Sequence, residues 1–243
     1  MKKELNRIAK VIARSGLCSR RDAEKKIESG EVNVNGEIIY SPALNVSSSD
    51  IILVNGKQIN QTLQTKLFIY NKPVGLITSH KDSFGRPTVF ENISKEFGRL
   101  LSIGRLDLNS SGLLLLTNDG AFQRFMENPK NKFERIYKVR IYGDISKHNF
   151  DKLKYGIVID GFRYNKIDVK INKVQGANTW IEVKLTEGKN REIRKVMQFL
   201  GYQVNKLIRI SYAGINLDNL NIGEVKEIKI PSKIFSKFIK FES

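Results

Sequence analysis

A nine-residue segment between two glycines places the strongest constraint on how this chain can fold. It runs Gly104-Arg105-Leu106-Asp107-Leu108-Asn109-Ser110-Ser111-Gly112, and the apolar run 113–116 follows at once. The apolar run predicts a buried strand. The segment before it is expected to be a loop that holds the Asp107 carboxylate at a fixed place on a rigid scaffold, beside the cation of Arg105.

The charge of the chain indicates a polyanionic partner. Lys and Arg number 42 against 25 Asp and Glu, which gives a formal net charge of +17. An excess of this size is typical of proteins that neutralise nucleic-acid phosphates; a basic but merely soluble surface is the alternative. No apolar stretch approaches the roughly 20 residues of a membrane span, and the N-terminus lacks the apolar segment of a secretory signal.

Neither disulfide nor metal chemistry is expected. Cys18 is the only cysteine, and His80 and His148 lie far apart in polar contexts. A single thiol cannot form an internal disulfide, and it fits a reducing compartment. The sequence also has no P-loop, no dinucleotide-binding glycine pattern and no Ser–His pair. We therefore expect no metal ion and no cofactor.

The first 60 residues are expected to fold as a small unit of two helices and two hairpins. Apolar residues recur at helical spacing over positions 5–13, which predicts a first helix. Ser19 is a good N-cap for a second helix, and Gly30 suits its end. Two Asn-Gly pairs, at 35–36 and 55–56, predict tight turns between short strands.

Basic residues decorate this helix pair, and we expect Arg7, Arg20 and Arg21 to contact a phosphate backbone. The segment Leu17-Cys18-Ser19-Arg20-Arg21-Asp22-Ala23-Glu24, with the later Gly30 and Val34-Asn35-Gly36, resembles the alpha-L RNA-binding module. That module is shared by a small-subunit ribosomal protein and several RNA-modifying enzymes.

A larger α+β domain with a mixed or mostly antiparallel sheet is expected after a linker at 58–66, because strand and helix patterns intersperse without strict alternation. The domains are expected at 1–62 and 63–243. Expected strands cover 67–70, 113–116, 137–142 and 180–185, and expected helices cover 122–127, 147–153 and 192–200. Residues 232–243 suit either a basic tail on RNA or a docked helix.

Five segments of this domain together resemble one enzyme family. They are Asn71-Lys72-Pro73-Val74-Gly75, Gly85-Arg86-Pro87-Thr88-Val89-Phe90, Gly104-Arg105-Leu106-Asp107, Arg135-Ile136-Tyr137-Lys138-Val139 and Glu187-Gly188-Lys189-Asn190-Arg191-Glu192-Ile193-Arg194. In this order they resemble the catalytic domain of pseudouridine synthases of the RsuA/RluB type. Asn109 and the Arg86-Pro87-Thr88 segment are most similar to the RluB branch, which acts on large-subunit ribosomal RNA.

The resemblance implies a role for each site residue. Asp107 matches the aspartate that attacks C1′ of the target uridine, and Arg194 matches the basic residue that pairs with it. Tyr137 matches the tyrosine that stacks on the target base. Arg105 matches a residue that fills the space of the flipped nucleotide, while Lys189 and Arg191 are assigned to phosphate contacts.

Other interpretations stay open at the level of sequence. Taken alone, Asp107 could cap a turn and Tyr137 could be an aromatic side chain of the core. Arg194 could form an ion pair with Glu187 or Glu192. The target RNA could be small-subunit ribosomal RNA or tRNA, and a non-catalytic assembly factor would share the fold. The expected protein is a cytoplasmic monomer that acts on ribosomal RNA or a pre-ribosomal particle, away from membranes.

Overall fold

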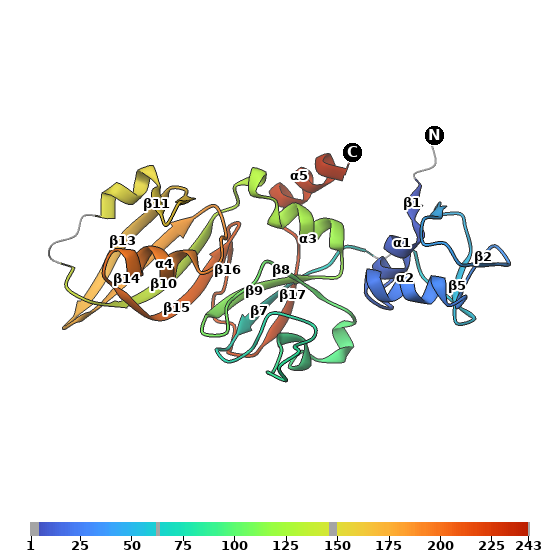
Figure 1. Ribbon diagram of the computed structural model, residues 1–243, viewed down its shortest axis with the longest axis horizontal. Helices are drawn as coiled ribbons and strands as arrows, with labels where there is room; N and C mark the ends of the chain where they lie inside the picture. The colour runs from blue at the N-terminus through green and yellow to red at the C-terminus, as the bar shows by residue number, and fades with distance from the viewer. Residues whose placement is uncertain (1–4, 62–63, 146–149, 243) are drawn as a thin grey trace. The chain divides into compact units, whose positions relative to one another are not determined.

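The computed structural model describes residues 5–61, 64–145 and 150–242. These residues form two compact units (Figure 1). The small unit holds the chain up to Lys66 with the short segments 95–101 and 118–120, and the large unit holds the rest. The expected domain boundary between positions 62 and 63 lies outside the described residues.

The second helix of the small unit begins and ends as the sequence predicts, whereas the first begins at Ile8 and not at position 5, because Asn6–Arg7 forms strand β1. The two helices are α1 (Ile8–Arg14) and α2 (Arg20–Glu28). Ser19 caps α2, because its hydroxyl accepts a hydrogen bond from the Asp22 amide at 3.1 Å. Gly30 follows α2 at a φ of 75°, which glycine adopts without strain.

Both predicted Asn-Gly hairpins are present in the small unit. Its four-stranded sheet has the order β3-β2-β5-β6. The strands are β2 (Val32–Val34), β3 (Glu37–Ile39), β5 (Ile52–Val54) and β6 (Lys57–Gln58), and a separate pair joins β1 (Asn6–Arg7) to β4 (Asn45–Val46). Fully buried aliphatic side chains of the helices and strands, such as Ile12, Ile27 and Ile52, form one core.

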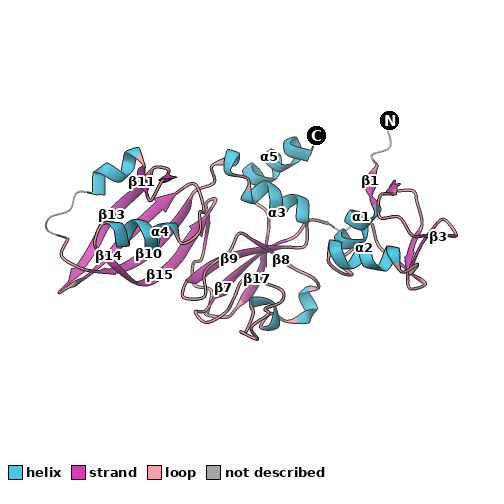
Figure 2. Cartoon of the chain, in the orientation of Figure 1, coloured by secondary structure: helices cyan, strands magenta, loops and turns pink. Residues whose placement is uncertain are grey.

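A nine-stranded mixed sheet forms the centre of the large unit (Figure 2). Its main path has the order β13-β14-β10-β15-β9-β7-β17, with β16 paired to β15 and β8 to β9. The strands are β7 (Leu67–Lys72), β8 (Leu101–Ile103), β9 (Ser111–Thr117), β10 (Arg135–Tyr142), β13 (Ile167–Gln175), β14 (Asn178–Leu185), β15 (Gln203–Tyr212), β16 (Ile215–Asn216) and β17 (Val225–Ile228). Neighbours along the main path are antiparallel except β9 with β15, which are parallel, and β16 is antiparallel to β15. The α+β class is confirmed.

Three helices cover parts of this sheet. They are α3 (Gly120–Glu127), α4 (Glu192–Phe199) and α5 (Ser232–Glu242). The α3 and α5 helices lie side by side in Figure 1. Between them, the Phe122 and Phe238 rings meet edge to face, with their centres 5.1 Å apart. Residues 232–242 therefore form a helix that docks on the large unit, as one of the two sequence interpretations expects, and not an extended basic tail. Among the described residues, no helix is long and apolar enough to cross a membrane.

Short elements complete the large unit. The 3-10 turns are η1 (Val89–Glu91), η2 (Lys95–Phe97, counted with the small unit), η3 (Pro129–Asn131) and η4 (Phe150–Tyr155), and β11 (Ile157–Ile159) pairs with β12 (Phe162–Tyr164). The sequence predicts a helix over 147–153. Positions 147–149 lie outside the described residues, and positions 150–153 belong to the 3-10 helix η4, so the described part is helical with 3-10 geometry.

Candidate active site

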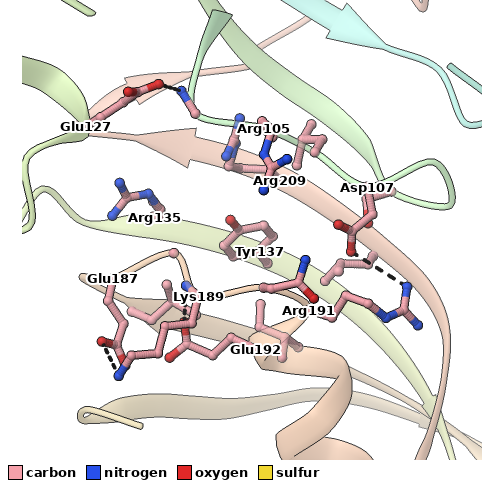
Figure 3. A pocket seen from close by; sticks show the side chains of 18 of the residues that line it. Arg105, Asp107, Glu127, Arg135, Tyr137, Glu187, Lys189, Arg191, Glu192 and Arg209 are labelled. Atoms are coloured by element: carbon pink, nitrogen blue, oxygen red, sulfur yellow. Dashed lines mark hydrogen bonds and ion pairs between the residues drawn. The ribbon is translucent and has the colours of Figure 1, made fainter. Parts of the chain in front are cut away.

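A cavity of about 750 Å³ opens in the large unit. Two chain segments form most of its wall, the loop 104–110 before β9 and the turn 187–193 that leads into α4 (Figure 3). Strands β10 and β15 contribute Arg135, Tyr137 and Arg209. Segments from four distant parts of the chain thus meet at one place.

Hydrogen bonds to its main chain hold the loop 104–110. The buried Thr78 hydroxyl donates to the Leu106 carbonyl at 2.9 Å and accepts from the Leu106 amide at 3.2 Å. The Gly75 amide donates to the Leu108 carbonyl at 2.8 Å. Within the loop, the Ser110 amide donates to the Asp107 carbonyl at 3.0 Å. These bonds fix the backbone on both sides of Asp107, as the sequence leads us to expect.

A fully buried lysine lies beneath the same loop. The Lys72 ammonium donates to the carbonyls of Pro73 at 2.9 Å, Ser110 at 2.9 Å and Asp107 at 3.3 Å. Burial lowers the pKa of Lys72 to about 8, and the Asp107 carboxylate opposes that shift. Lys72 stands in a segment that carries the family resemblance, yet nothing in the sequence indicates that it supports the loop.

Gly112 permits the close pairing that follows the loop. Strands β9 and β15 run parallel here, with Gly112 opposite Arg209. Gly112 has a φ of 97°, and a Cβ atom at this position would lie 2.3 Å from the Arg209 carbonyl oxygen. Only glycine allows both the backbone conformation and this approach.

The structure pairs Asp107 with a different arginine from the one expected. The Arg191 guanidinium lies 3.9 Å from the Asp107 carboxylate (Figure 3). Arg194 instead donates to the carbonyls of Asn109 at 2.7 Å and Val204 at 3.0 Å. Burial and the neighbouring Arg191 lower the pKa of Arg194, while Asp107 raises it. Arg194 therefore contacts the backbone of the Asp107 loop, and Arg191 provides the ion pair.

Tyr137 projects into the cavity from an irregular point of β10 (Figure 3). The pairing of β10 with β15 shifts its register between Ile136 and Tyr137. Bulges of this kind redirect side chains and are common beside active sites. Tyr137 is 8% exposed, so its ring is mostly enclosed while it still lines the cavity.

Two buried arginines add positive charge to the cavity wall. Arg135 donates to the Tyr212 hydroxyl at 2.7 Å and to the Thr186 carbonyl at 3.1 Å. Arg209 donates to the Leu113 carbonyl at 2.7 Å. Both guanidinium groups also lie over the Tyr212 ring. Arg209 cannot be recognised from the sequence, because its burial depends on the parallel contact of β15 with β9.

Carboxylates hold the second wall, the turn 187–193. Glu187 accepts from the Lys189 ammonium at 2.9 Å and from the Asn165 amide at 2.7 Å. The buried Glu192 carboxylate accepts from the Lys189 amide at 3.1 Å. Burial, together with the adjacent Glu187, raises the pKa of Glu192 to about 8. Arg191 has a left-handed φ of 51°, and this turn directs its side chain toward Asp107.

The expected site residues therefore fall into three groups. Asp107, Tyr137, Arg105, Lys189 and Arg191 line the cavity together. Arg194 lies outside the cavity lining and contacts the Asp107 loop from behind. Arg7, Arg20 and Arg21 are exposed on the small unit. Lys189 is held by Glu187 and by the Arg163 carbonyl, so its ammonium already has protein partners.

Comparison with known proteins assigns the chain to a family. The model for RNA pseudouridylate synthase matches residues 66–199, and the model for the S4 domain matches residues 6–52. The chain is an RNA pseudouridine synthase of the RsuA/RluB type. The isomerase class and the N-terminal RNA-binding module expected from the sequence are confirmed.

Relatives of this RNA pseudouridine synthase cover nearly its whole length. An uncharacterized RNA pseudouridine synthase of Rickettsia felis is 50% identical over 96% of this chain and 100% of its own. Ribosomal large subunit pseudouridine synthase B of Buchnera aphidicola subsp. Acyrthosiphon pisum is 37% identical over 93% of this chain and 94% of its own. A crystal structure of a pseudouridylate synthase superposes with a TM-score of 0.64 at 27% identity, covering 96% of this chain and 98% of that chain.

Proposed function

We propose that this enzyme converts a specific uridine of large-subunit ribosomal RNA to pseudouridine, with Asp107 as the nucleophile. The observation that carries the proposal is the position of Asp107, on a rigid loop at a cavity that Tyr137 and four arginines also line. The Buchnera relatives named ribosomal large subunit pseudouridine synthase B support the choice of RNA.

The proposed reaction replaces the bond between C1′ of the ribose and N1 of uracil with a bond between C1′ and C5 of uracil. The Asp107 carboxylate bonds to C1′ of the ribose as the C1′–N1 bond breaks, and the electron pair of that bond stays with uracil. Uracil then rotates within the cavity, and its C5 attacks C1′ and displaces the carboxylate. The C5 proton is lost and N1 gains a proton, so the product is an isomer of the substrate. An ionised carboxylate suits this role because it can attack and leave again.

The neighbouring side chains are proposed to position the nucleotide. Tyr137 stacks on the target base and accepts a proton in the isomerisation. Arg191, at 3.9 Å, forms an ion pair that orients the Asp107 carboxylate. Arg194 acts beside Asp107 by fixing the Asn109 carbonyl. Arg105 is exposed at the cavity and fills the gap left by the extruded nucleotide, while Lys189 adds positive charge near the RNA phosphates.

RNA capture is proposed to involve both units. We assign residues 1–62 to the RNA-binding module and residues 63–243 to the catalytic domain. Arg7, Arg20 and Arg21, all exposed, contact phosphates and set the position of the RNA rather than its sequence. The enzyme is proposed to act as a monomer in the cytoplasm, on ribosomal RNA or on a pre-ribosomal particle.

Removal of the nucleophile tests the chemistry. Asp107→Asn is expected to abolish tritium release from RNA labelled at C5 of uridine, while RNA affinity changes less than two-fold. Asp218→Asn, at an exposed turn, is the matched control and keeps full activity. Turnover retained by Asp107→Asn would contradict the assignment of the nucleophile.

The RNA target needs a separate experiment. Pseudouridines are mapped by carbodiimide treatment and primer extension in strains with and without the gene. We expect one site to vanish from large-subunit ribosomal RNA in the deletion strain and to return with the wild-type gene, but not with Asp107→Asn. A site that vanishes from small-subunit ribosomal RNA or tRNA would reassign the target. If Asp107→Asn restores growth and ribosome maturation fully, the non-catalytic assembly role is favoured.

A further inference from the structure

Arg209 lines the catalytic cavity as a buried cation without an anionic partner. It is 1% exposed, and it forms no ion pair with any residue in the described part of the chain. Its Nε donates to the Leu113 carbonyl at 2.7 Å, whereas neither terminal nitrogen has a hydrogen-bond partner among those residues, and Nη2 is fully enclosed. Burial of a cation is unfavourable unless an anion or a set of acceptors balances its charge. The unpaired guanidinium therefore points to a group that enters the cavity with the RNA.

The other arginines that line the cavity are held differently. Arg135 donates through both terminal nitrogens to oxygens of the protein, and Arg191 pairs with Asp107. Arg105 is exposed, so a phosphate of the RNA backbone can reach it from solvent. Arg209 is enclosed, so it can meet only a part of the RNA that enters the cavity. In the proposed reaction, that part is the target base.

The strand register places Arg209 between Tyr137 and the strand that follows the Asp107 loop. Arg209 is directly opposite Tyr137 on β10 and opposite Gly112 on β9. Residues that are opposite in neighbouring antiparallel strands carry their side chains on the same face of the sheet, with Cβ atoms about 4.5–5.5 Å apart. Arg209, Tyr137 and Asp107 all line the one cavity (Figure 3). A base that stacks on Tyr137 would thus have one edge toward the Arg209 guanidinium.

The protein also fixes the direction of this guanidinium. The bond from its Nε to the Leu113 carbonyl holds one side. Its central carbon lies 5.3 Å from the centre of the buried Tyr212 ring. Hydrogen-bond donors that are fixed in advance where negative charge develops stabilise a transition state strongly, because they need no reorganisation during the reaction.

The proposed reaction develops negative charge on uracil. The electron pair of the C1′–N1 bond stays with the base, which shares the charge with its O2 and O4 atoms. The rotation that exchanges N1 for C5 also exchanges O2 for O4, because N3 and C6 lie on its axis. A donor beside one carbonyl position therefore meets an oxygen both when the C1′–N1 bond breaks and when the C1′–C5 bond forms.

We propose that Arg209 is a further catalytic residue, whose guanidinium donates to a carbonyl oxygen of uracil and stabilises the negative charge on the detached base. An arginine stays protonated in proteins, so Arg209 transfers no proton, and Asp107 remains the nucleophile. This role rests on the proposed function for the reaction and for its RNA.

Tritium release under single-turnover conditions tests this role with the full chain. The probe is a large-subunit ribosomal RNA transcript labelled at C5 of uridine. In Arg209→Met the rate constant at saturating enzyme should fall about 10²- to 10³-fold, as the loss of one such donor predicts, while RNA affinity changes less than about two-fold. Arg140→Met is the matched control, because Arg140 is a half-buried arginine on the other face of β10. It should keep the wild-type rate constant.

Arg209→Lys tests the direction of the charge. It keeps a cation but loses the bond from Nε to the Leu113 carbonyl, so the rate constant should fall about ten-fold. A wild-type rate constant in this variant would overturn the proposed role. The lysine variant also decides the question if Arg209→Met does not fold.

Chemical rescue separates a catalytic charge from support of the fold. In Arg209→Ala, guanidinium ion at millimolar concentration, far below the denaturing range, should restore part of the tritium release. Urea, a neutral molecule of similar shape, should not. Equal rescue by both compounds, or no rescue in a variant with the wild-type free energy of unfolding, would overturn the proposed role.

The remaining outcomes distinguish Arg209 from the proposed function. If Asp107→Asn is inactive and Arg209→Met keeps the wild-type rate constant, only the role of Arg209 fails. Weaker RNA binding at an unchanged rate constant would also overturn that role, because Arg209 would then contact a phosphate. Turnover retained by Asp107→Asn would instead count against the proposed function, whatever the Arg209 variants do.

Discussion

The two walls of the cavity are stabilised by different kinds of interaction. The loop 104–110 is held through its backbone, by Thr78, Gly75 and the buried Lys72. The turn 187–193 is held through ionisable side chains, chiefly Glu187 and Glu192. Substitutions that alter the packing of the backbone should therefore destabilise the first wall. The stability of the second wall should depend on side-chain charge and on pH.

Substitution of Gly112 should have the largest effect on the first wall. In Gly112→Ala a Cβ atom would lie 2.3 Å from the Arg209 carbonyl oxygen at a φ of 97°. We expect a loss of about 3–5 kcal/mol in the free energy of unfolding, from left-handed strain together with overpacking. Chemical denaturation measures it, and tritium release should fall with it.

Gly176→Ala is the control for this prediction. Gly176 also has a positive φ, of 58°, but a Cβ atom there would meet nothing within 4 Å. The strain alone should cost about 1–2 kcal/mol. Equal losses of unfolding free energy in the two variants would show that the close approach of β9 to β15 does not contribute to the cost of Gly112→Ala.

Removal of Lys72 should have the next largest effect. Lys72→Met leaves one buried and two partly buried carbonyls without this donor, at a cost of about 2–3 kcal/mol. Because the loop then holds Asp107 less accurately, kcat should fall about 10²-fold, with KM nearly unchanged. Lys226→Met, at an exposed lysine, should change neither quantity. A raised KM at constant kcat would mean that Lys72 serves RNA binding and not the position of the loop.

The smallest effect is expected in the second wall, where it should depend on pH. Burial raises the pKa of Glu192 to about 8, so between the ordinary Glu pKa and about 8 the folded chain retains a proton that the unfolded chain has lost. Wild-type stability should therefore fall as pH rises through this window. Glu192→Gln removes the ionisation, so its free energy of unfolding should exceed that of the wild type by more at pH 9 than at pH 5.

Thermal melts at both pH values measure this difference. Glu134→Gln, at an exposed carboxylate, controls for the loss of one negative charge and should show no such trend. A Glu192→Gln variant that is less stable at pH 9 than at pH 5, relative to the wild type, would mean that the carboxylate is ionised in the folded chain.

Local patterns in the sequence predict much of the fold. The Ser19 cap, the two Asn-Gly turns and the apolar run 113–116 each specify their element through neighbouring residues, and the structure contains all three. The edge strand β13 was not predicted. Its residues 170–175 are all exposed, so they lack the alternation of buried and exposed positions that marks a strand.

The candidate site also has parts that the sequence predicts and parts that it does not. The Asp107 loop and Tyr137 stand in motifs that can be found by eye, and the structure places both at one cavity. The partner of Asp107 could not be predicted, because it depends on the left-handed backbone of Arg191, at a φ of 51°. Lys72 and Arg209 were missed because only contacts between distant strands bury them.

The parallel pairing of β9 with β15 has a consequence for the order of folding. It joins Ser111 and Gly112 to Ile208 and Arg209, nearly a hundred residues later in the chain. Contacts this distant in sequence form late, because the closure of a long loop must precede them. On the ribosome, β15 can complete its pairing with β9 only after residue 209 has been synthesised. A nascent chain shorter than this contains Asp107 but lacks the β9–β15 pairing beside the loop that carries it.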